Sequence, residues 1–369
     1  MKLVFSSFPE FSDNSLMILR SVIQQEIHAK CIWLVNDVKN LPAIKEKANK
    51  YIGINTDKIV FVKKNSILGI YHFLTAHFVF ETHGMFEQFP LLPWQKKINL
   101  WHGMPLKRIG RLSGNPIKLK MDATISTAPI FDEVMATSFE IPTDKIMKIG
   151  QPRNDLFFEP TKMNFELLFN NKNRTIAWLP TYRQSDVGDV RVDGVQEVDS
   201  VGGISKSALE KLDQVLIVQH INLAIKLHPM DILNDQLGEF DQFTNIKFLT
   251  KKNFANLNIE VNDFLNATVG LITDYSSVYF DYILTGNPIG ILQLDKNSYA
   301  GGRGFVSDEV AQEFEGINIS SLTDFINFIE NIGLKQDDQA FWKQKVRLFD
   351  SYDRTGKNSR ELLKLLYLK

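Results

Sequence analysis

The chain has 369 residues, enough for two or three domains, and its 44% apolar and 23% charged residues are typical of a globular protein. Disordered, collagen-like and disulfide-stapled classes are therefore excluded. A formal net charge of −1 argues against a general nucleic-acid binder. The single cysteine, Cys31, excludes an internal disulfide and a cysteine-rich zinc site.

No segment is expected to span a membrane or to direct secretion. The most apolar stretch, residues 267–294, is interrupted by Asp274 and Asp281, whereas a spanning helix needs about 18 uncharged residues. The N-terminus lacks the apolar run of about 7–15 residues that a secretory signal requires. With the lone cysteine, these features predict a cytoplasmic protein.

Predicted strands and helices alternate along the chain. Short runs rich in β-branched and aromatic residues predict strands at residues 2–5, 58–62, 77–80, 97–101, 123–127 and 146–149, and again at 175–179, 224–227, 246–249, 269–273 and 288–292. Helical periodicity appears at residues 15–25, 41–51, 205–219 and 276–285. This alternation predicts an α/β protein with parallel sheets covered by helices.

A polar segment at residues 159–174 separates two halves of similar size. We therefore expect an N-terminal domain over residues 1–165 and a second domain over residues 166–337. A final helical run, residues 338–369, has no strand after it and is expected to pack across both halves.

Polar and basic residues follow strand after strand, and open parallel sheets bind ligands beyond the carboxyl ends of their strands. The candidates in the first half are His102, Lys107, Arg108, Arg153 and Asn154, and those in the second half are Thr181, His228, Asp274, Ser276 and Ser277. Two α/β domains facing each other would bring these residues into one cleft.

The histidines divide into candidate catalytic residues and residues that we interpret as structural. His102 and His228 each follow a strand beside a proline-containing turn, and either is a candidate general base. His72, His77 and His83 are spaced five and six residues apart, which does not match a helical metal pair, so we interpret them as structural.

Other motifs restrict the chemistry. Ser276 and Ser277 are placed to cap the following helix, whose first N–H groups suit a phosphate, although a serine cap is most often only a cap. Glycine-rich phosphate loops are absent, which disfavours a kinase or a dinucleotide-dependent dehydrogenase.

Basic residues concentrate in one stretch, residues 94–121, which has seven lysines and arginines and no acidic residue. Residues 1–160 carry 20 basic and 15 acidic residues, a net charge of +5, and the remainder carries 22 and 28, a net charge of −6. The stretch is either a solvated loop or a patch for an anionic partner, such as a phosphate-bearing substrate or a membrane surface.

Five ordered segments resemble motifs of the CDP-glycerol glycerophosphotransferases, which build teichoic acids and related polyol-phosphate capsules. They are WHGMPLK from Trp101, GQPRND from Gly150, LPTYR from Leu179, KLHP from Lys226 and ITDYSSVYFDY from Ile272. Residues 303–305 and 356–360 resemble later family segments more loosely. Met104 stands where the family commonly has threonine, which affects a hydroxyl contact there and not the neighbouring His102.

The resemblance implies a GT-B-like fold with two Rossmann-like domains, an interdomain cleft and a C-terminal helix crossing back. It implies that an acceptor hydroxyl attacks the β-phosphorus of CDP-glycerol or CDP-ribitol and that CMP leaves. The acceptor would be lipid-linked or polymeric, and attachment to anionic lipid of the inner leaflet would be peripheral. No cofactor or metal would be required, because histidines and helix ends would stabilise the charge.

The resemblance also implies roles for single residues. His102 would be the general base, and His228 would bind the pyrophosphate and stabilise the leaving CMP. The donor site would include Ser276, Ser277, Asp274, Thr181, Arg153 and Asn154, and Lys107 and Arg108 would neutralise phosphate on the donor or the polymer.

Two other interpretations stay open. One is a GT-B nucleotide-sugar glycosyltransferase, for instance a capsule enzyme that uses CMP-sialate, and the other is a non-catalytic binding module with the same fold. The residues do not distinguish glycerol from ribitol phosphate, or addition of one unit from polymer extension.

Overall fold

The computed structural model describes residues 1–53, 57–114, 118–181, 200–228, 242–293, 304–332 and 339–368. The motif residues Tyr182, Arg183, Pro229 and Arg303 lie outside these ranges. The chain forms two compact units. The first contains Met1–Met104, Ile109–Pro160 and Arg347–Lys369, and the second contains Pro105–Arg108 and Thr161–Val346.

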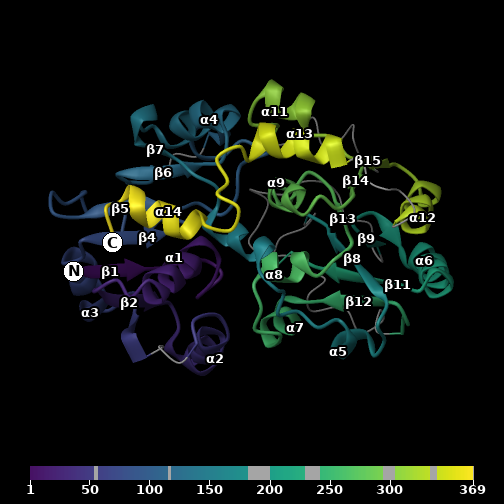
Figure 1. The fold of residues 1–369 in the computed structure, drawn as a ribbon, viewed down its shortest axis with the longest axis horizontal. Coiled ribbons are helices and arrows are strands. Elements are labelled where there is room, and N and C mark those ends of the chain that lie inside the picture. Colours follow the sequence, from purple (N-terminus) through teal and green to yellow (C-terminus); the bar gives the residue numbers. More distant parts are fainter. Residues whose placement is uncertain are drawn as a thin grey trace. The chain divides into compact units, whose positions relative to one another are not determined.

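The first unit is built on a parallel sheet with strand order β3-β2-β1-β4-β5-β6-β7 (Figure 1). Its strands are β1 (Lys2–Phe5), β2 (Lys30–Val35), β3 (Ile59–Lys63), β4 (Phe78–Glu81), β5 (Lys96–Asn99), β6 (Ala123–Ser126) and β7 (Ile146–Lys148). Strand order reverses between β1 and β4, which pair directly. This arrangement is a doubly wound, Rossmann-like sheet.

Apolar side chains cover both faces of this sheet. On one face the rings of Phe5 and Phe80, which pair in register, stack 5.3 Å apart. On the other face Val4 and Val79 pack with Phe73. The surrounding helices are α1 (Asp13–Gln24), α2 (Leu41–Tyr51), α3 (Ile67–Leu74) and α4 (Pro129–Phe139), with 3-10 turns η1 (Val38–Asn40), η3 (Gly110–Ser113), η4 (Thr143–Lys145) and η5 (Pro152–Phe158).

The second unit contains a parallel sheet with strand order β12-β11-β8-β13-β14-β15. Its strands are β8 (Arg174–Leu179), β11 (Ile221–Lys226), β12 (Ile246–Leu249), β13 (Gly270–Thr273), β14 (Ile289–Leu292) and β15 (Ile317–Ile319), with a separate hairpin of β9 (Ser200–Val201) and β10 (Ile204–Ser205). Order reverses between β8 and β13, so this sheet is also Rossmann-like.

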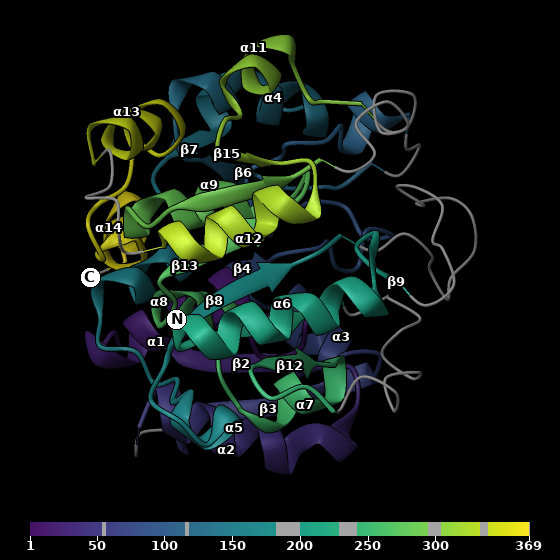
Figure 2. The ribbon, with the colours of Figure 1, turned by 90° about the vertical axis from the view of Figure 1, so that its right-hand side faces the viewer.

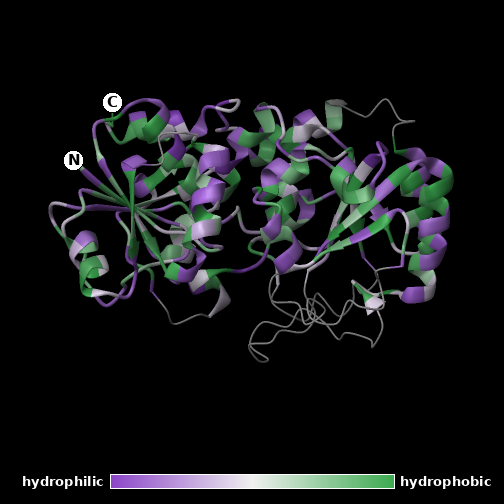
Figure 3. Cartoon of the chain, turned by 90° about the horizontal axis from the view of Figure 1, so that it is seen from below, coloured by the Kyte–Doolittle hydropathy of each residue, from purple (hydrophilic) through white to green (hydrophobic). Residues whose placement is uncertain are grey.

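Helices α6 (Lys206–Gln219) and α12 (Leu322–Asn331) cover one face of the second sheet (Figure 2). The indole of Trp178 meets the ring of Phe325 edge-on at 5.4 Å within this core. Apolar and polar residues lie side by side along the helices, as amphipathic helices require (Figure 3). The other helices of the unit are α5 (Glu166–Phe169), α7 (Lys251–Asn256), α8 (Val261–Asn266), α9 (Val278–Tyr282) and α11 (Asp308–Glu313), with the 3-10 turn η9 (Ile283–Thr285).

The C-terminal segment contains two helices, α13 (Gln339–Phe349) and α14 (Asn358–Leu365), where one helical run was expected. The chain rejoins the first unit at Arg347. There the Asp155 carboxylate accepts hydrogen bonds from the backbone N–H groups of Asn358 and Ser359, at 2.7 and 2.9 Å, at the start of α14. The two Rossmann-like units give the GT-B-like architecture that the motifs implied.

Candidate functional site

His102 lies in a tightly fixed turn after β5, in the first unit. Trp101 adopts a positive φ of 51°, and its N–H donates to Asn99 Oδ1 at 2.8 Å. The amide of Asn14 donates to the carbonyls of Leu100 and Trp101 at 3.1 and 3.0 Å. The strand end and helix α1 therefore hold the backbone of this turn together.

The hydrogen bond of the His102 ring indicates which nitrogen carries the proton. Nδ1 lies 3.3 Å from the carbonyl oxygen of Thr82, which can only accept a hydrogen bond. A neutral ring bonded in this way carries its proton on Nδ1 and leaves the lone pair on Nε2. The half-buried ring thus has the tautomer that a general base needs.

Arg153, predicted to bind the donor, contacts the backbone of the His102 turn. Its Nη1 donates to the His102 carbonyl at 2.9 Å and to both oxygens of Asp13 at 3.1 and 3.2 Å. Its backbone N–H donates to Asn14. The guanidinium is thereby engaged within the first unit, which favours a positioning role.

Asn154, also predicted to bind the donor, is fully buried in the first unit. Its side-chain amide donates to Asp350 Oδ2 at 3.3 Å. Because no part of Asn154 is exposed, this placement favours a structural role in joining η5 to the segment after α13.

Thr181 and Asp274 meet across the point where strand order reverses in the second sheet. Thr181 donates its backbone N–H to both carboxylate oxygens of Asp274, at 3.1 and 3.0 Å, and its hydroxyl donates at 2.5 Å. The buried carboxylate therefore fixes the chain after β8. This geometry gives Asp274 a positioning role, and its predicted contact with the donor stays a prediction.

His228 follows β11 at the same edge of the second sheet, among positive charges. Burial, together with Lys226 and Lys107, lowers the pKa of His228 to about 4, so its ring is neutral near pH 7. Burial also lowers the pKa of Lys226 to about 8, and its Nζ lies 4.8 Å from the centre of the Phe254 ring. This concentration of positive charge is suited to an anion.

Ser276 and Ser277 follow Asp274 at the start of the short helix α9. Both are half-buried. Ser277 occupies the cap position without bonding the helix through its hydroxyl, and Ser276 Oγ accepts from the N–H of Val278 at 3.5 Å. The serines therefore bring hydroxyl groups to the edge that also carries Thr181.

Lys107 and Arg108 belong to the second unit, although His102 in the same motif belongs to the first. Lys107 forms an antiparallel bridge with Phe305. The Arg108 side chain donates to the Phe305 carbonyl at 3.3 Å, and its backbone N–H donates to the carbonyl of Gly304 at 3.2 Å. Of this pair, the half-buried Lys107 is the residue whose positive charge helps to lower the pKa of His228.

The basic stretch 94–121 does not form one basic surface. Lys97 is only 2% exposed and bonds Glu81 and Glu87. Arg111 and Lys118 both pair with Glu140. Acidic residues from elsewhere in the chain therefore neutralise the charge of these three residues, and the choice between a solvated loop and a patch for an anionic partner stays a prediction for the others.

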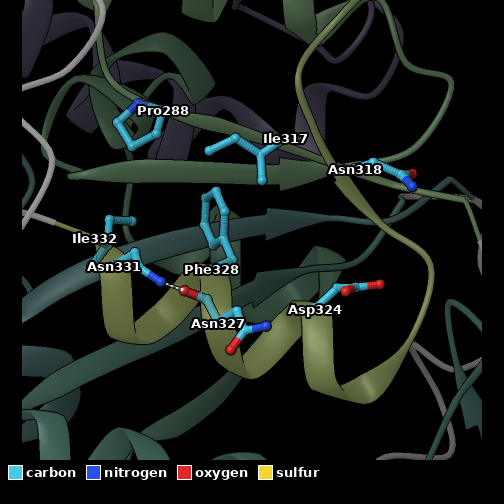
Figure 4. A pocket seen from close by; sticks show the side chains of 8 residues that line it. All are labelled: Pro288, Ile317, Asn318, Asp324, Asn327, Phe328, Asn331 and Ile332. Atoms are coloured by element: carbon cyan, nitrogen blue, oxygen red, sulfur yellow. Dashed lines mark hydrogen bonds between the residues drawn. The ribbon is translucent and has the colours of Figure 1, made fainter.

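A cavity of about 230 Å³ lies apart from these residues, between α12 and β15 (Figure 4). Its lining includes Pro288, just before β14, and Ile317, the first residue of β15. Both mark the amino ends of parallel strands, opposite the edge that carries Asp274. Since ligands bind at the carboxyl edge of such sheets, this cavity is not the candidate site.

Two residues near the predicted site were not predicted to be part of it. His83 stacks on His102 with ring centres 4.1 Å apart, although its spacing suggested a structural role. Lys226 lies in the KLHP segment, but its burial and its effect on His228 are not visible in a linear pattern.

Two wider features concern metals and membranes. Over the described ranges, no three His, Cys, Asp or Glu side chains are grouped so as to hold a metal ion. In the same part of the chain, no helix combines the length and apolarity needed to cross a bilayer.

Known proteins resemble almost the whole chain. A family model described as CDP-glycerol:poly(glycerophosphate) glycerophosphotransferase matches residues 1–368. A teichoic acid glycerol-phosphate transferase from Staphylococcus aureus is 24% identical over 64% of this chain and 61% of its own length. A teichoic acid poly(ribitol-phosphate) polymerase from Bacillus spizizenii is 25% identical over 64% of this chain and 39% of its own length. The matched part thus spans less than two thirds of these relatives.

A solved structure shares the fold. The wall teichoic acid polymerase TagF aligns with a TM-score of 0.75 at 20% identity, covering 99% of this chain and 88% of that one. A UDP-GlcNAc 2-epimerase from Neisseria meningitidis aligns less closely, with a TM-score of 0.54 at 12% identity and full coverage of both chains.

Proposed function

Because the chain belongs to the CDP-glycerol:poly(glycerophosphate) glycerophosphotransferase family, we propose that it transfers a polyol phosphate from a CDP-activated donor to an acceptor hydroxyl. Glycerol phosphate is the first candidate, and ribitol phosphate is the second, since relatives named for each polyol match almost equally. The acceptor is lipid-linked or polymeric, and the product belongs to a teichoic-acid-like or capsule polymer.

In the proposed reaction, His102 Nε2 takes the proton of the acceptor hydroxyl. The acceptor oxygen forms a bond with the β-phosphorus, the bond from that phosphorus to the bridging oxygen breaks, and CMP leaves. The observation that supports this role is the bond between Nδ1 and the Thr82 carbonyl, which leaves Nε2 as the base. A base of this kind contributes roughly 10²–10⁴-fold to the rate.

The second unit supplies the donor contacts in this proposal. Neutral His228 donates a hydrogen bond to the diphosphate, and the charges of Lys226 and Lys107 favour the anion. The hydroxyls of Ser276 and Ser277 hold phosphate oxygens. Charge stabilisation of the leaving CMP by these groups needs no obligatory metal, because phosphoryl transfer depends mainly on positioning and electrostatics.

A donor screen tests the proposal. The protein is incubated with CDP-glycerol, CDP-ribitol or CMP-sialate and a matching acceptor, and released CMP and the product are measured by mass spectrometry. We expect CMP and a phosphodiester product with one of the CDP-polyols. Transfer from CMP-sialate alone would support the sugar transferase, and binding of donors without turnover would support a non-catalytic module.

We also propose that the protein attaches peripherally to anionic lipid at the cytoplasmic face of the membrane. The supporting feature is an exposed apolar surface on α3, where Ile67 is 90% exposed and Tyr71 is 54% exposed. Trp94, 62% exposed, is tied to this helix by its indole N–H, which donates to the Leu74 carbonyl at 3.0 Å. The Lys2 ammonium lies 4.7 Å from the centre of the Tyr71 ring, which adds positive charge beside the apolar surface.

Flotation with vesicles tests this attachment. Aromatic and aliphatic side chains flanked by lysines favour an anionic interface, so we expect binding to phosphatidylglycerol vesicles and loss of binding in Ile67→Glu. The matched control is Leu167→Glu, which changes an equally exposed leucine of the second unit. Absence of binding to anionic vesicles at physiological salt would remove the membrane proposal and leave the transferase proposal intact.

A further inference from the structure

His83 lies at the carboxyl edge of the first sheet, next to the point where strand order reverses. It comes directly after Thr82 at the end of β4, and β4 pairs with β1 where strand order reverses. Doubly wound sheets bind their ligands at this point, beyond the carboxyl ends of the strands. The Thr82 hydroxyl lies 2.9 Å from His83 Nδ1 and accepts from the N–H of Phe8 at 3.2 Å, which links the segments after both strands.

The ring of His83 lies flat against the ring of His102. The ring centres are 4.1 Å apart and the planes differ by 13°. His83 is exposed and His102 is half-buried, so the outer ring covers part of the inner one. Thr82 connects the two, because its hydroxyl meets His83 and its carbonyl meets the Nδ1 of His102.

Other neighbours of these rings include two uncharged rings and an ion pair. Trp101 contacts His102 and Phe8 contacts His83, and neither of these rings is charged. Arg153 reaches the His102 backbone carbonyl and is paired with Asp13. His83 is thus an ionisable group that lies directly on the ring of the proposed base.

We infer that His83 is a positioning residue for the transfer reaction, which holds the ring of His102 in place and stabilises its protonated form by stacking. This inference rests on the proposed role of His102 as the base. When the acceptor proton moves to His102 Nε2, the resulting imidazolium lies on the face of a neutral aromatic ring, an attractive arrangement. The proton is later released to solvent, so His83 itself gains and loses no atom.

The same contact has a consequence at acid pH. Two protonated imidazoles this close repel each other, so a proton on exposed His83 opposes a second proton on His102. His83 would therefore keep the base in its active, neutral form to lower pH than an uncharged neighbour would. A ring that served only to pack would not have this effect.

Two substitutions separate stacking from charge. His83→Ala removes the ring, and we expect kcat to fall about two- to fivefold with the donor KM unchanged, because stacking on the imidazolium matters only after proton transfer. His83→Phe keeps a ring but cannot be protonated, so turnover near pH 8 should be largely retained while the acid limb of the kcat/KM profile moves to higher pH. His28→Ala, an exposed histidine outside the site, is the matched control.

The result that would overturn the inference is a His83→Ala enzyme with the turnover of the His28→Ala control, or a His83→Phe enzyme with an unmoved acid limb. His102→Ala, measured alongside, distinguishes failure of the role of His83 from failure of the proposed base. If His102→Ala is severely impaired and the His83 variants are normal, only the role of His83 fails. If His102→Ala is normal, the proposed base fails with it.

Discussion

The Arg153 side chain connects the His102 turn to helix α1, through bonds to the His102 carbonyl and to Asp13. Arg153→Ala leaves the Asp13 carboxylate, which is 10% exposed, without this cation. We expect the free energy of unfolding to fall by about 2–3 kcal/mol, because the variant leaves a largely buried carboxylate without the cation that offsets its desolvation. Urea denaturation measures the loss.

Arg111→Ala is the control for that measurement. Arg111 pairs with Glu140 at 3.6 Å, but its side chain is 70% exposed. Exposed pairs add little stability, so the unfolding midpoint of this variant should match that of the unmodified protein. An equal loss in both variants would contradict the role assigned to Arg153.

Lys226 makes donor binding depend on pH. Its pKa of about 8 means that it is mostly charged at pH 7 and mostly neutral at pH 9. An anionic donor favours the charged form, so affinity should fall as the pH rises through 8. We expect calorimetric titration with CDP-glycerol to show weaker binding at pH 9 than at pH 7, and a smaller difference in Lys226→Met.

The exposed Lys172, in the same unit, provides the matched substitution. Lys172→Met should retain the pH dependence of the unmodified protein. If Lys226→Met also retains it in full, Lys226 does not contribute to the donor site.

Single residues show where prediction from the sequence stops. His102 and His228 were recognisable because each follows a predicted strand within a motif. The stacking of His83 on His102 joins residues 19 positions apart through folding, so local spacing could not reveal it. Likewise, the charge of Lys97 is cancelled by Glu81, which lies on the neighbouring strand.

At the scale of elements, the packing of α12 on the second sheet supports β13, the strand that ends at Thr273 just before Asp274. Ile329 is completely buried in that core, so Ile329→Ala should lower the free energy of unfolding by about 2–4 kcal/mol through lost burial and a residual cavity. Asn327→Ala, on the exposed side of the same helix, should change it by less than about 0.5 kcal/mol. Equal losses in chemical denaturation would contradict this packing.

Most strands were predictable because they are short, β-rich and separated by helical patterns. β2, with the sequence KCIWLV, was not predicted. It is buried on both faces, so its apolar run lacks the alternation that identifies a strand. β15 was also missed, because three residues at a sheet edge carry too little pattern. The cap of α14 by Asp155 depends on residues 203 positions apart, beyond any local signal.

At the scale of the whole molecule, the first unit is completed by the end of the chain. Leu362 and Leu363 of α14 are fully buried, and Asp155 caps that helix. We therefore predict that a fragment of residues 1–160 folds poorly alone and gains cooperative unfolding when it is mixed with a peptide of residues 347–369. Circular dichroism during thermal unfolding tests this.

A Leu362→Asp peptide is the control for complementation, because a charge at this buried position should prevent docking. Complementation by both peptides, or stable folding of the fragment alone, would contradict the assignment of the C-terminal segment to the first unit.

The central claim is that proton removal by His102 and donor binding at the His228 edge serve one transfer reaction. The most direct test measures CDP-glycerol binding and single-turnover CMP release in His102→Ala. We predict donor affinity close to that of the unmodified protein and CMP release at least about a hundredfold slower. Release at nearly the normal rate would contradict the account.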